Sequence, residues 1–496
     1  RIAHYRGGAD STPVLTRLGT QEWGKIVGRA RESTRRLAFD LLKIYAEREI
    51  ENGHPFAQDT PWQREMEDAF PFEPTPGQIR AIAEVKEDMQ LGKPMDRLIC
   101  GDVGYGKTEV AVRATFKAVM DNKQVAILVP TTVLAQQHYD TFSERLGPFP
   151  IRIELLSRFR TSREQNQVIR GLGDGEIDVV IGTHRLLQKD IRFRDLGLAI
   201  IDEEHRFGVQ QKETMKNVRK HVDILTMTAT PIPRTLHMAM TGIRDISLIE
   251  SPPEDRLPIK TYLGESSDEL VRDAILREID RGGQVFYLHN RIRSIEFIRA
   301  KLNDLIPQAK VLVAHAQMPE QDLAGVMSEF RKRGADVLLC TTIIESGLDL
   351  PAVNTIIIDR ADRFGLAQLY QLRGRIGRRA QRGYAYLLVP RGQKLSGAAL
   401  LRLEAILSAS DLGAGFQIAN NDLEIRGAGN ILGAEQSGYI HAVGLDLYTK
   451  LLSKAVSELR EEDSGTPRPV NSVQDISIDL DLDAFVPDEF IEDLST

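Results

Sequence analysis

One short segment constrains the fold of this chain more than any other. Residues 101–108 read Gly-Asp-Val-Gly-Tyr-Gly-Lys-Thr, which fits the pattern G-x-x-x-x-G-K-T. The apolar run 97–100 before it predicts a buried strand, and the periodic pattern from Glu109 predicts a helix. Between a strand and a helix, this loop is typical of phosphate binding, because glycines let backbone amides converge on the anion. The expected nucleotide-binding residues are Gly101, Gly104, Gly106, Lys107, which reaches the phosphates, and Thr108, which also ligates magnesium.

Length and composition set the broad class. A chain of 496 residues exceeds one hydrophobic core, so we expect two to four domains. Its 42% apolar and 27% charged residues are typical of globular proteins. No run approaches the roughly 18 apolar residues of a membrane span, so we expect no membrane partner. Cys100 and Cys340 each end a predicted strand, which favours reduced core residues over a disulfide or a zinc site.

The net charge of −7 comes from one end of the chain. Residues 475–496 contain eight acidic residues and neither Lys nor Arg, and the remainder is close to neutral. A neutral body still holds local basic tracks, so the net charge neither excludes nor supports nucleic-acid binding. The first residue is not Met and no secretory pattern follows it, so we expect a piece of a longer protein.

Two series of short β-rich runs alternate with helical stretches, which is typical of parallel sheets with crossover helices. The first series predicts strands at 97–100, 125–129, 178–182, 198–202 and 224–228. The second predicts strands at 284–288, 311–314, 337–340, 355–358 and 384–389. Because 251–258 between them is rich in proline, we read it as a linker. The sequence therefore predicts an α/β fold of two parallel-sheet domains with a nucleotide cleft between them.

The remaining segments complete the expected domain order. Residues 1–20 look like the tail of a small β-rich module, and the basic segment 21–52 is either a solvated amphipathic helix or a connector helix packed on the rest. The expected units that follow are 53–250 for the first α/β domain, 251–397 for the second, 398–460 for helices around a Gly-rich loop, and 461–496 for a linker and the start of a further domain.

Two more clusters fit nucleotide hydrolysis. The predicted strand 198–202 ends in acids, of which Asp202 suits magnesium binding and Glu203 suits the activation of water, although acids here also cap helices. His205 either senses the γ-phosphate or is a core histidine, and its spacing does not decide between them. Segment 371–379 places arginines around two glycines, which suits a phosphate clamp across a cleft or a basic surface turn.

With these motifs in order, the chain resembles the motor of superfamily-two helicases. The resemblance implies two RecA-like domains, with ATP and Mg²⁺ as cofactors. It implies that Phe72 and Gln78 read the adenine, and that Gly347 and Asp349 lie near the nucleotide. The catalytic residues that it implies are Glu203, Arg375 and Arg378.

The matching motifs also imply contacts to DNA and a route from hydrolysis to movement. The implied DNA-binding residues are Thr131, Thr132, Gln136, Thr183, His184 and Thr342. The implied coupling residues are His205, Thr228, Thr230, Gln371 and Arg426.

The subgroup follows from longer segments. Segments 202–208 and 411–438 resemble the RecG-like branch, whose TRG element (translocation in RecG) is a helical hairpin and loop. Segments 5–23 and 478–490 resemble the transcription-repair coupling factor family. That resemblance implies an ATP-dependent translocase on double-stranded DNA, a monomer in the bacterial cytoplasm associated with the nucleoid. In a full-length protein it implies RNA polymerase and UvrA as partners. A RecG-like helicase that remodels branched DNA and a non-catalytic ATP-sensing scaffold on RNA polymerase remain as alternatives.

Overall fold

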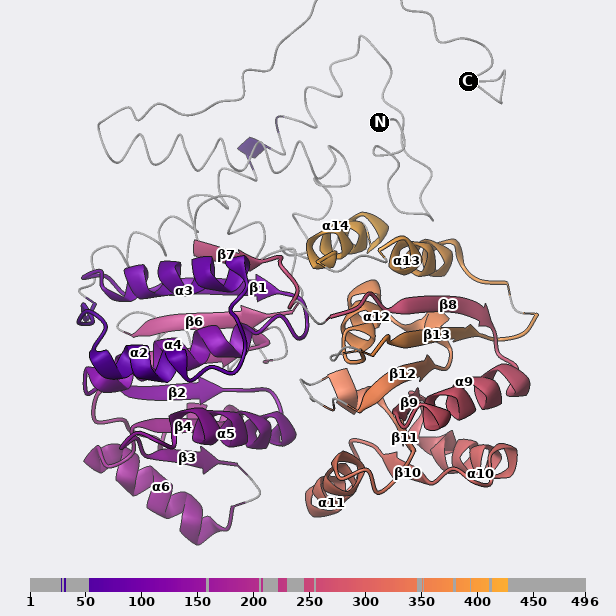
Figure 1. The fold of residues 1–496 in the computed structure, drawn as a ribbon, viewed down its shortest axis with the longest axis horizontal. Coiled ribbons are helices and arrows are strands. Elements are labelled where there is room, and N and C mark those ends of the chain that lie inside the picture. The colour runs from indigo at the N-terminus through magenta and orange to yellow at the C-terminus, as the bar shows by residue number, and fades with distance from the viewer. Residues whose placement is uncertain are drawn as a thin grey trace, which may run out of the picture.

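The computed structural model describes two α/β units, which lie side by side in Figure 1. The described residues are Gly28, Arg31 and Glu32, with the ranges 53–157, 160–204, 207, 222–229, 245–253, 256–345, 350, 352–377, 381–392, 394–409 and 413–426. The expected module at 1–20, almost all of 21–52, and the segment 427–496 lie outside them.

The first unit is built on a seven-stranded parallel sheet in the order β3-β4-β2-β5-β6-β1-β7. Its strands are β1 (Asp96–Gly101), β2 (Gln124–Leu128), β3 (Ile153–Leu156), β4 (Val179–Gly182), β5 (Leu196–Asp202), β6 (Asp223–Thr228) and β7 (Asp245–Ile249). Its helices in the described residues are α2 (Pro61–Asp68), α3 (Pro76–Met89), α4 (Lys107–Met120), α5 (Thr132–Leu146), α6 (Ser162–Asp174) and the 3₁₀ helix η2 (His184–Leu187).

The second unit has a six-stranded parallel sheet in the order β10-β11-β9-β12-β13-β8. Its strands are β8 (Lys260–Glu265), β9 (Gln284–Leu288), β10 (Val311–Ala314), β11 (Val337–Cys340), β12 (Val353–Ile358) and β13 (Tyr384–Val389). Its α-helices are α9 (Asp268–Asp280), α10 (Ile295–Leu305), α11 (Glu320–Arg331), α12 (Leu366–Arg373), α13 (Gly397–Ser408) and α14 (Gly415–Arg426). Its 3₁₀ helices are η4 (Ile292–Ser294), η5 (Thr342–Glu345) and η6 (Ala361–Arg363).

The central strands explain why the sequence forms these sheets. All residues of β1 and β9 are buried, because helices cover both faces of a parallel sheet. The apolar runs 98–100 and 285–288 form most of these two strands. Helix starts are fixed by polar caps: Thr75 and Gln78 form a capping box at α3, and Thr161 and Glu164 form another at α6. The carboxyl ends of the first sheet's strands point toward the second unit (Figure 1).

The expected α/β class with two parallel sheets is confirmed, and all ten predicted strands are present. Three strands were not predicted, namely β3, β7 and β8, and each lies at an edge of its sheet. The described residues of the predicted linker 251–258 contain neither helix nor strand. Helices α13 and α14 begin the expected helical element, most of which lies outside the described residues, so its hairpin and the domain boundaries stay predictions. No helix in the described part of the chain has the length and apolar character that crossing a membrane requires.

Candidate nucleotide and DNA site

The predicted phosphate loop joins β1 to α4. Gly104 and Gly106 have φ angles of +82° and +75°, a backbone region that glycine reaches without steric cost. Gly106 is also the N-cap of α4, and a Cβ added there would lie 2.1 Å from Nε2 of Gln78. Only glycine fits at this position, so the strand, loop and helix lie as the sequence pattern requires.

The ammonium group of Lys107 lies inside this loop. Its Nζ donates hydrogen bonds to the carbonyl oxygens of Gly101 (2.6 Å) and Asp102 (2.9 Å). Burial lowers the pKa of Lys107, while the negative charges of Glu203 and Asp202 oppose that shift. The loop therefore holds its cation beside the two acids that the sequence singled out.

Asp202 ends β5 and receives a contact that the sequence did not predict. Nε2 of His138, in α5, lies 3.1 Å from Oδ2 of Asp202. Burial alone raises the pKa of Asp202, but the hydrogen bond and charge of His138, with the charges of Lys107 and Arg375, outweigh it and hold the pKa below its ordinary value. Asp202 is therefore an ionised carboxylate, as a magnesium ligand must be.

Glu203 is only 5% exposed and has a φ of +51°, in the left-handed region. Its carboxylate accepts hydrogen bonds from Oγ1 of Thr228 (3.2 Å) and from the backbone N–H of Ala229 (3.4 Å). These partners come from the end of β6, which pairs with β5 in parallel, so the two strand ends meet. The candidate for activating water thus contacts a candidate for coupling hydrolysis to movement.

Arg375, from the second unit, is close enough to Asp202 of the first unit for its charge to affect that carboxylate. It follows α12 and is 4% exposed, and its charge helps to lower the pKa of Asp202 in the first unit. Gln371, another coupling candidate, is buried within α12. A cation from each unit, Lys107 and Arg375, therefore acts on one carboxylate.

Two contacts between the phosphate loop and the rest of the chain were also missed. The hydroxyl of Tyr370 donates to Oδ2 of Asp102, and the backbone N–H of Gly413 donates to the same atom at 3.0 Å. The guanidinium of Arg256 donates to the carbonyl oxygens of Val103 and Gly374, the latter at 3.3 Å. Asp102 and Val103 occupy variable positions of the loop pattern, so no sequence signal singles them out.

The expected adenine-binding residues lie on α3 and before it. Gln78 is buried, and its side chain donates to the carbonyl oxygen of Tyr105 (2.9 Å) and accepts from the N–H of Thr75 (2.9 Å). Phe72 is 69% exposed, with its ring 5.6 Å from that of Phe70. Gln78 thus fixes the phosphate loop, while Phe72 offers an open aromatic face.

The DNA-binding candidates occupy helix starts in both units. Thr131 caps α5 by accepting from the N–H of Leu134 (3.4 Å), and Thr132 begins that helix. Thr342 begins η5 in the second unit. Val133 and Ile343, each next to one of these threonines, pack against the same hydrophobic cluster, so both helix starts lie against the core of the second unit.

The other DNA-binding candidates differ in exposure. Gln136 donates to Oδ1 of Asp140 (2.8 Å) at the surface of α5. His184 is half-buried at the start of η2. Thr183 is 2% exposed, and its Oγ1 has no hydrogen-bond partner among the described residues. Its side chain is therefore not presented at the surface in this structure.

Several candidates cannot be located. His205, Thr230, Gly347, Asp349 and Arg378 lie outside the described residues, as does the side chain of Arg426. The roles of all the site residues stay predictions.

The donor atoms suit magnesium held jointly with a nucleotide. Within the described ranges, no group of three or more His, Cys, Asp or Glu residues could hold a metal ion by itself. The Thr108 hydroxyl and the Asp202 carboxylate would supply oxygen ligands, which magnesium prefers, and magnesium commonly takes its remaining ligands from phosphates and water.

Comparison with known proteins assigns the family. A DEAD/DEAH box helicase domain matches residues 75–239 and a helicase conserved C-terminal domain matches 267–380, together more than half of the chain. Transcription-repair-coupling factors from Staphylococcus aureus (strain USA300) and Staphylococcus epidermidis are each 52% identical, over 491 and 495 residues. Each alignment covers 99% of this chain and 42% of the relative, so the chain spans about two fifths of these curated relatives.

Solved structures agree. RecG bound to a three-way DNA junction is 37% identical with a TM-score of 0.70, covering 86% of this chain and 57% of that one. The DEAD-box helicase Mss116, at 14% identity and a TM-score of 0.58, shares the fold. The chain therefore belongs to the superfamily-two helicases, in the family of the transcription-repair-coupling factors, and is an ATP-dependent enzyme of that superfamily.

Proposed function

We propose that this chain is a motor that uses ATP to move along double-stranded DNA. One arrangement carries the proposal: the phosphate loop of the first unit contacts the second unit, where Tyr370 donates to Asp102, and the charges of Lys107 and Arg375 from the two units both favour the ionised form of Asp202. Phosphoryl-transfer sites stabilise the charge that develops on the phosphates with cations from opposite sides. A triphosphate placed here would therefore bind both units at once, and its hydrolysis would change how the units are held together.

The side chains divide the chemistry of hydrolysis among them. Bound magnesium, held by Thr108 and Asp202, would neutralise phosphate charge. Glu203 would accept the proton of the attacking water. Thr228 holds its carboxylate in a fixed orientation, and an ionised carboxylate can only accept hydrogen bonds. Arg375, with Arg378, would stabilise the charge that develops on the transferred phosphate.

The DNA contacts would be independent of sequence. Thr131, Thr132 and Thr342 offer hydroxyl groups and helix N-termini, which suit phosphate oxygens and read no base edge. Because they come from both units, closing and reopening of the nucleotide cleft would shift one grip along the duplex relative to the other. Binding should weaken as salt concentration rises.

In a longer protein we infer a role in transcription-coupled repair. The motor would push a stalled RNA polymerase and recruit excision repair through UvrA, acting as a monomer in the bacterial cytoplasm at the nucleoid. The names of the 52%-identical relatives support this role, and the chain spans 42% of their length.

The alternative is a RecG-like helicase that remodels branched DNA, which the RecG relative favours since that protein was bound to a three-way junction. ATP-dependent displacement of a triplex strand from linear duplex, compared with unwinding of a synthetic fork, separates the two. We expect triplex displacement without fork unwinding. Fork unwinding with no triplex displacement would select the alternative. A non-catalytic ATP-sensing scaffold disagrees with the family assignment, because the chain belongs to a family of ATP-dependent enzymes.

A further inference from the structure

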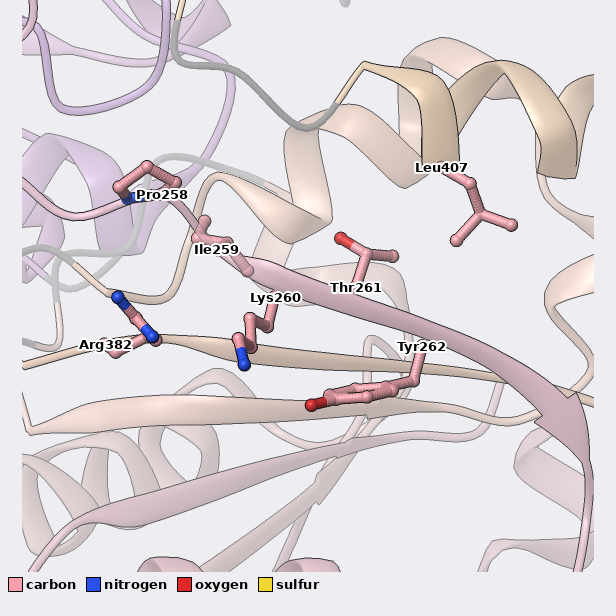
Figure 2. A pocket seen from close by; sticks show the side chains of 7 residues that line it. All are labelled: Pro258, Ile259, Lys260, Thr261, Tyr262, Arg382 and Leu407. Atoms are coloured by element: carbon pink, nitrogen blue, oxygen red, sulfur yellow. The ribbon is translucent and has the colours of Figure 1, made fainter.

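A second site lies at the outer edge of the second sheet, where β8 lines a cavity of about 430 Å³. Figure 2 shows Thr261 and Leu407, from β8 and α13, on one side of the strand, with Lys260, Tyr262 and Arg382 on the other. None of these residues belongs to the nucleotide or DNA site described above.

The backbone of β8 is open along this edge. In the described sheet β8 pairs with β13 alone, and the N–H of Lys260 donates to the carbonyl oxygen of Gly383 at 3.0 Å. Because residues of a parallel strand alternate in direction, the backbone groups of Lys260 and Tyr262 face β13 and those of Thr261 and Leu263 face outward. The outward groups bond to no residue in the described part of the chain, so this edge can accept another strand.

The side chains around the edge define what such a strand would carry. Lys260 and Arg382 are exposed and form no ion pair with any described residue. Oγ1 of Thr261 is buried without a hydrogen-bond partner in the same part of the chain. Tyr262 is 43% exposed and stacks on Tyr386 with ring centroids 5.2 Å apart, which makes a rigid aromatic surface.

We propose that the β8 edge binds an extended acidic segment of a partner protein as an added strand. Backbone pairing with Thr261 and Leu263 would set its register, and its acidic side chains would meet Lys260 and Arg382. Apolar side chains on the other face would enter the cavity against Leu407. A nucleic-acid strand fits less well, because its backbone has no N–H groups to pair with the open edge.

The test uses the whole chain and a fluorescent hexapeptide of alternating Asp and Val, with alternating Lys and Val as the control peptide. Lys260→Glu combined with Arg382→Glu should weaken binding by about tenfold or more, since each lost ion pair is replaced by repulsion. Lys332→Glu, at the end of α11 beside the opposite sheet edge, is the matched control and should leave the affinity unchanged.

A backbone variant tests strand addition directly. Thr261→Pro removes one outward N–H without breaking a hydrogen bond to β13, because proline is tolerated where the strand N–H faces away from the sheet. We expect binding to fall about tenfold or more, whereas Thr261→Val, which keeps the N–H, should change it by less than about threefold. Equal unfolding temperatures of Thr261→Pro and the parent would exclude a folding defect. If Thr261→Pro does not fold, the variant with Lys260→Glu and Arg382→Glu still tests the proposal.

Three results would overturn the proposal. The first is that the acidic peptide binds the charge-reversal variant and Lys332→Glu with equal affinity, or that it does not bind the parent chain at all. The second is binding of an oligothymidine at this edge in preference to the acidic peptide. The third is peptide binding only after removal of 475–496, which would assign the edge to this chain's own acid-rich segment. The ATPase plays no part in these measurements, so they stand apart from the proposed motor function.

Discussion

Glu203→Gln is the sharpest test of the hydrolytic site. The amide has the shape of the carboxylate and its oxygen still accepts a hydrogen bond from Thr228 or Ala229, so the left-handed backbone at residue 203 is retained. What the amide lacks is the ability to accept a proton from water. General-base catalysis is worth roughly 10²–10⁴ in rate, so kcat should fall by that factor, or about 3–5 kcal/mol in the activation barrier.

Nucleotide binding should survive this change. The negative charge of Glu203 lies near Lys107 and would repel a triphosphate, so its loss should leave ATP affinity unchanged or tighten it. The assay is steady-state ATP hydrolysis with saturating duplex DNA, together with titration of a fluorescent ATP analogue. A kcat within about threefold of the parent, at unchanged affinity, would remove Glu203 from the proposed role.

Thr228→Val is the matched control, because it removes the hydroxyl that donates to Oε2 of Glu203 and leaves the carboxylate in place. A lost hydrogen bond to a charged group costs about 1.5–3 kcal/mol, so kcat should fall by about tenfold to a hundredfold. The two substitutions touch one interaction, so their effects in the double variant should not add. A larger loss for Thr228→Val than for Glu203→Gln would show that the hydroxyl acts by some other route.

Three further predictions concern stability and reactivity. Tyr105→Phe should keep or raise the unfolding temperature, because the Tyr105 hydroxyl is buried with no hydrogen-bond partner among the described residues; a clear decrease would contradict this. Asp59→Asn should destabilise by about 2 kcal/mol in urea unfolding, since Nζ of the buried Lys117 lies 2.9 Å from Oδ1 of Asp59. Burial raises the pKa of Asp59, but hydrogen bonds from Lys86 and Lys117 lower it overall. The stability that the Asp59 carboxylate contributes is therefore present above about pH 4 and lost as pH falls further. A difference in unfolding free energy between the parent and Asp59→Asn that persists at about pH 2 would refute this. Burial raises the pKa of the Cys100 thiol to about 12, so a thiol reagent at pH 8 should label Cys100 only on unfolding.

The central strands could be predicted because burial on both faces leaves a run of apolar residues, as at 98–100 in β1 and 285–288 in β9. Strands at the edge lack that signal. β8 alternates exposed and half-buried residues, and its sequence Lys-Thr-Tyr-Leu-Gly-Glu has no apolar run. It is a strand because β13 pairs with it, which no local pattern reveals.

The site shows the same division. The approach of Glu203 to Thr228 follows from two parallel strands whose ends meet, and the sequence predicted both strands but not the contact. His138 gave no signal, because one histidine within a helix is usually a packed core residue. Its contact with Asp202 at the end of β5 depends on how α5 packs against β3 and β4, which is a property of the folded unit and not of any local segment.

Contacts of Asp102 connect the phosphate loop to helices of the second unit. The ammonium group of Lys107 donates to the backbone carbonyl oxygen of Asp102 at 2.9 Å. The side chain of the same Asp102 accepts from Tyr370 in α12 and from Gly413 just before α14. A Cβ at Gly415 would lie 2.4 Å from Oδ1 of Asp102, so α14 begins in direct contact with the loop. One residue therefore contacts both the lysine of the phosphate loop and the start of α14, so this loop is also where the helical element is anchored.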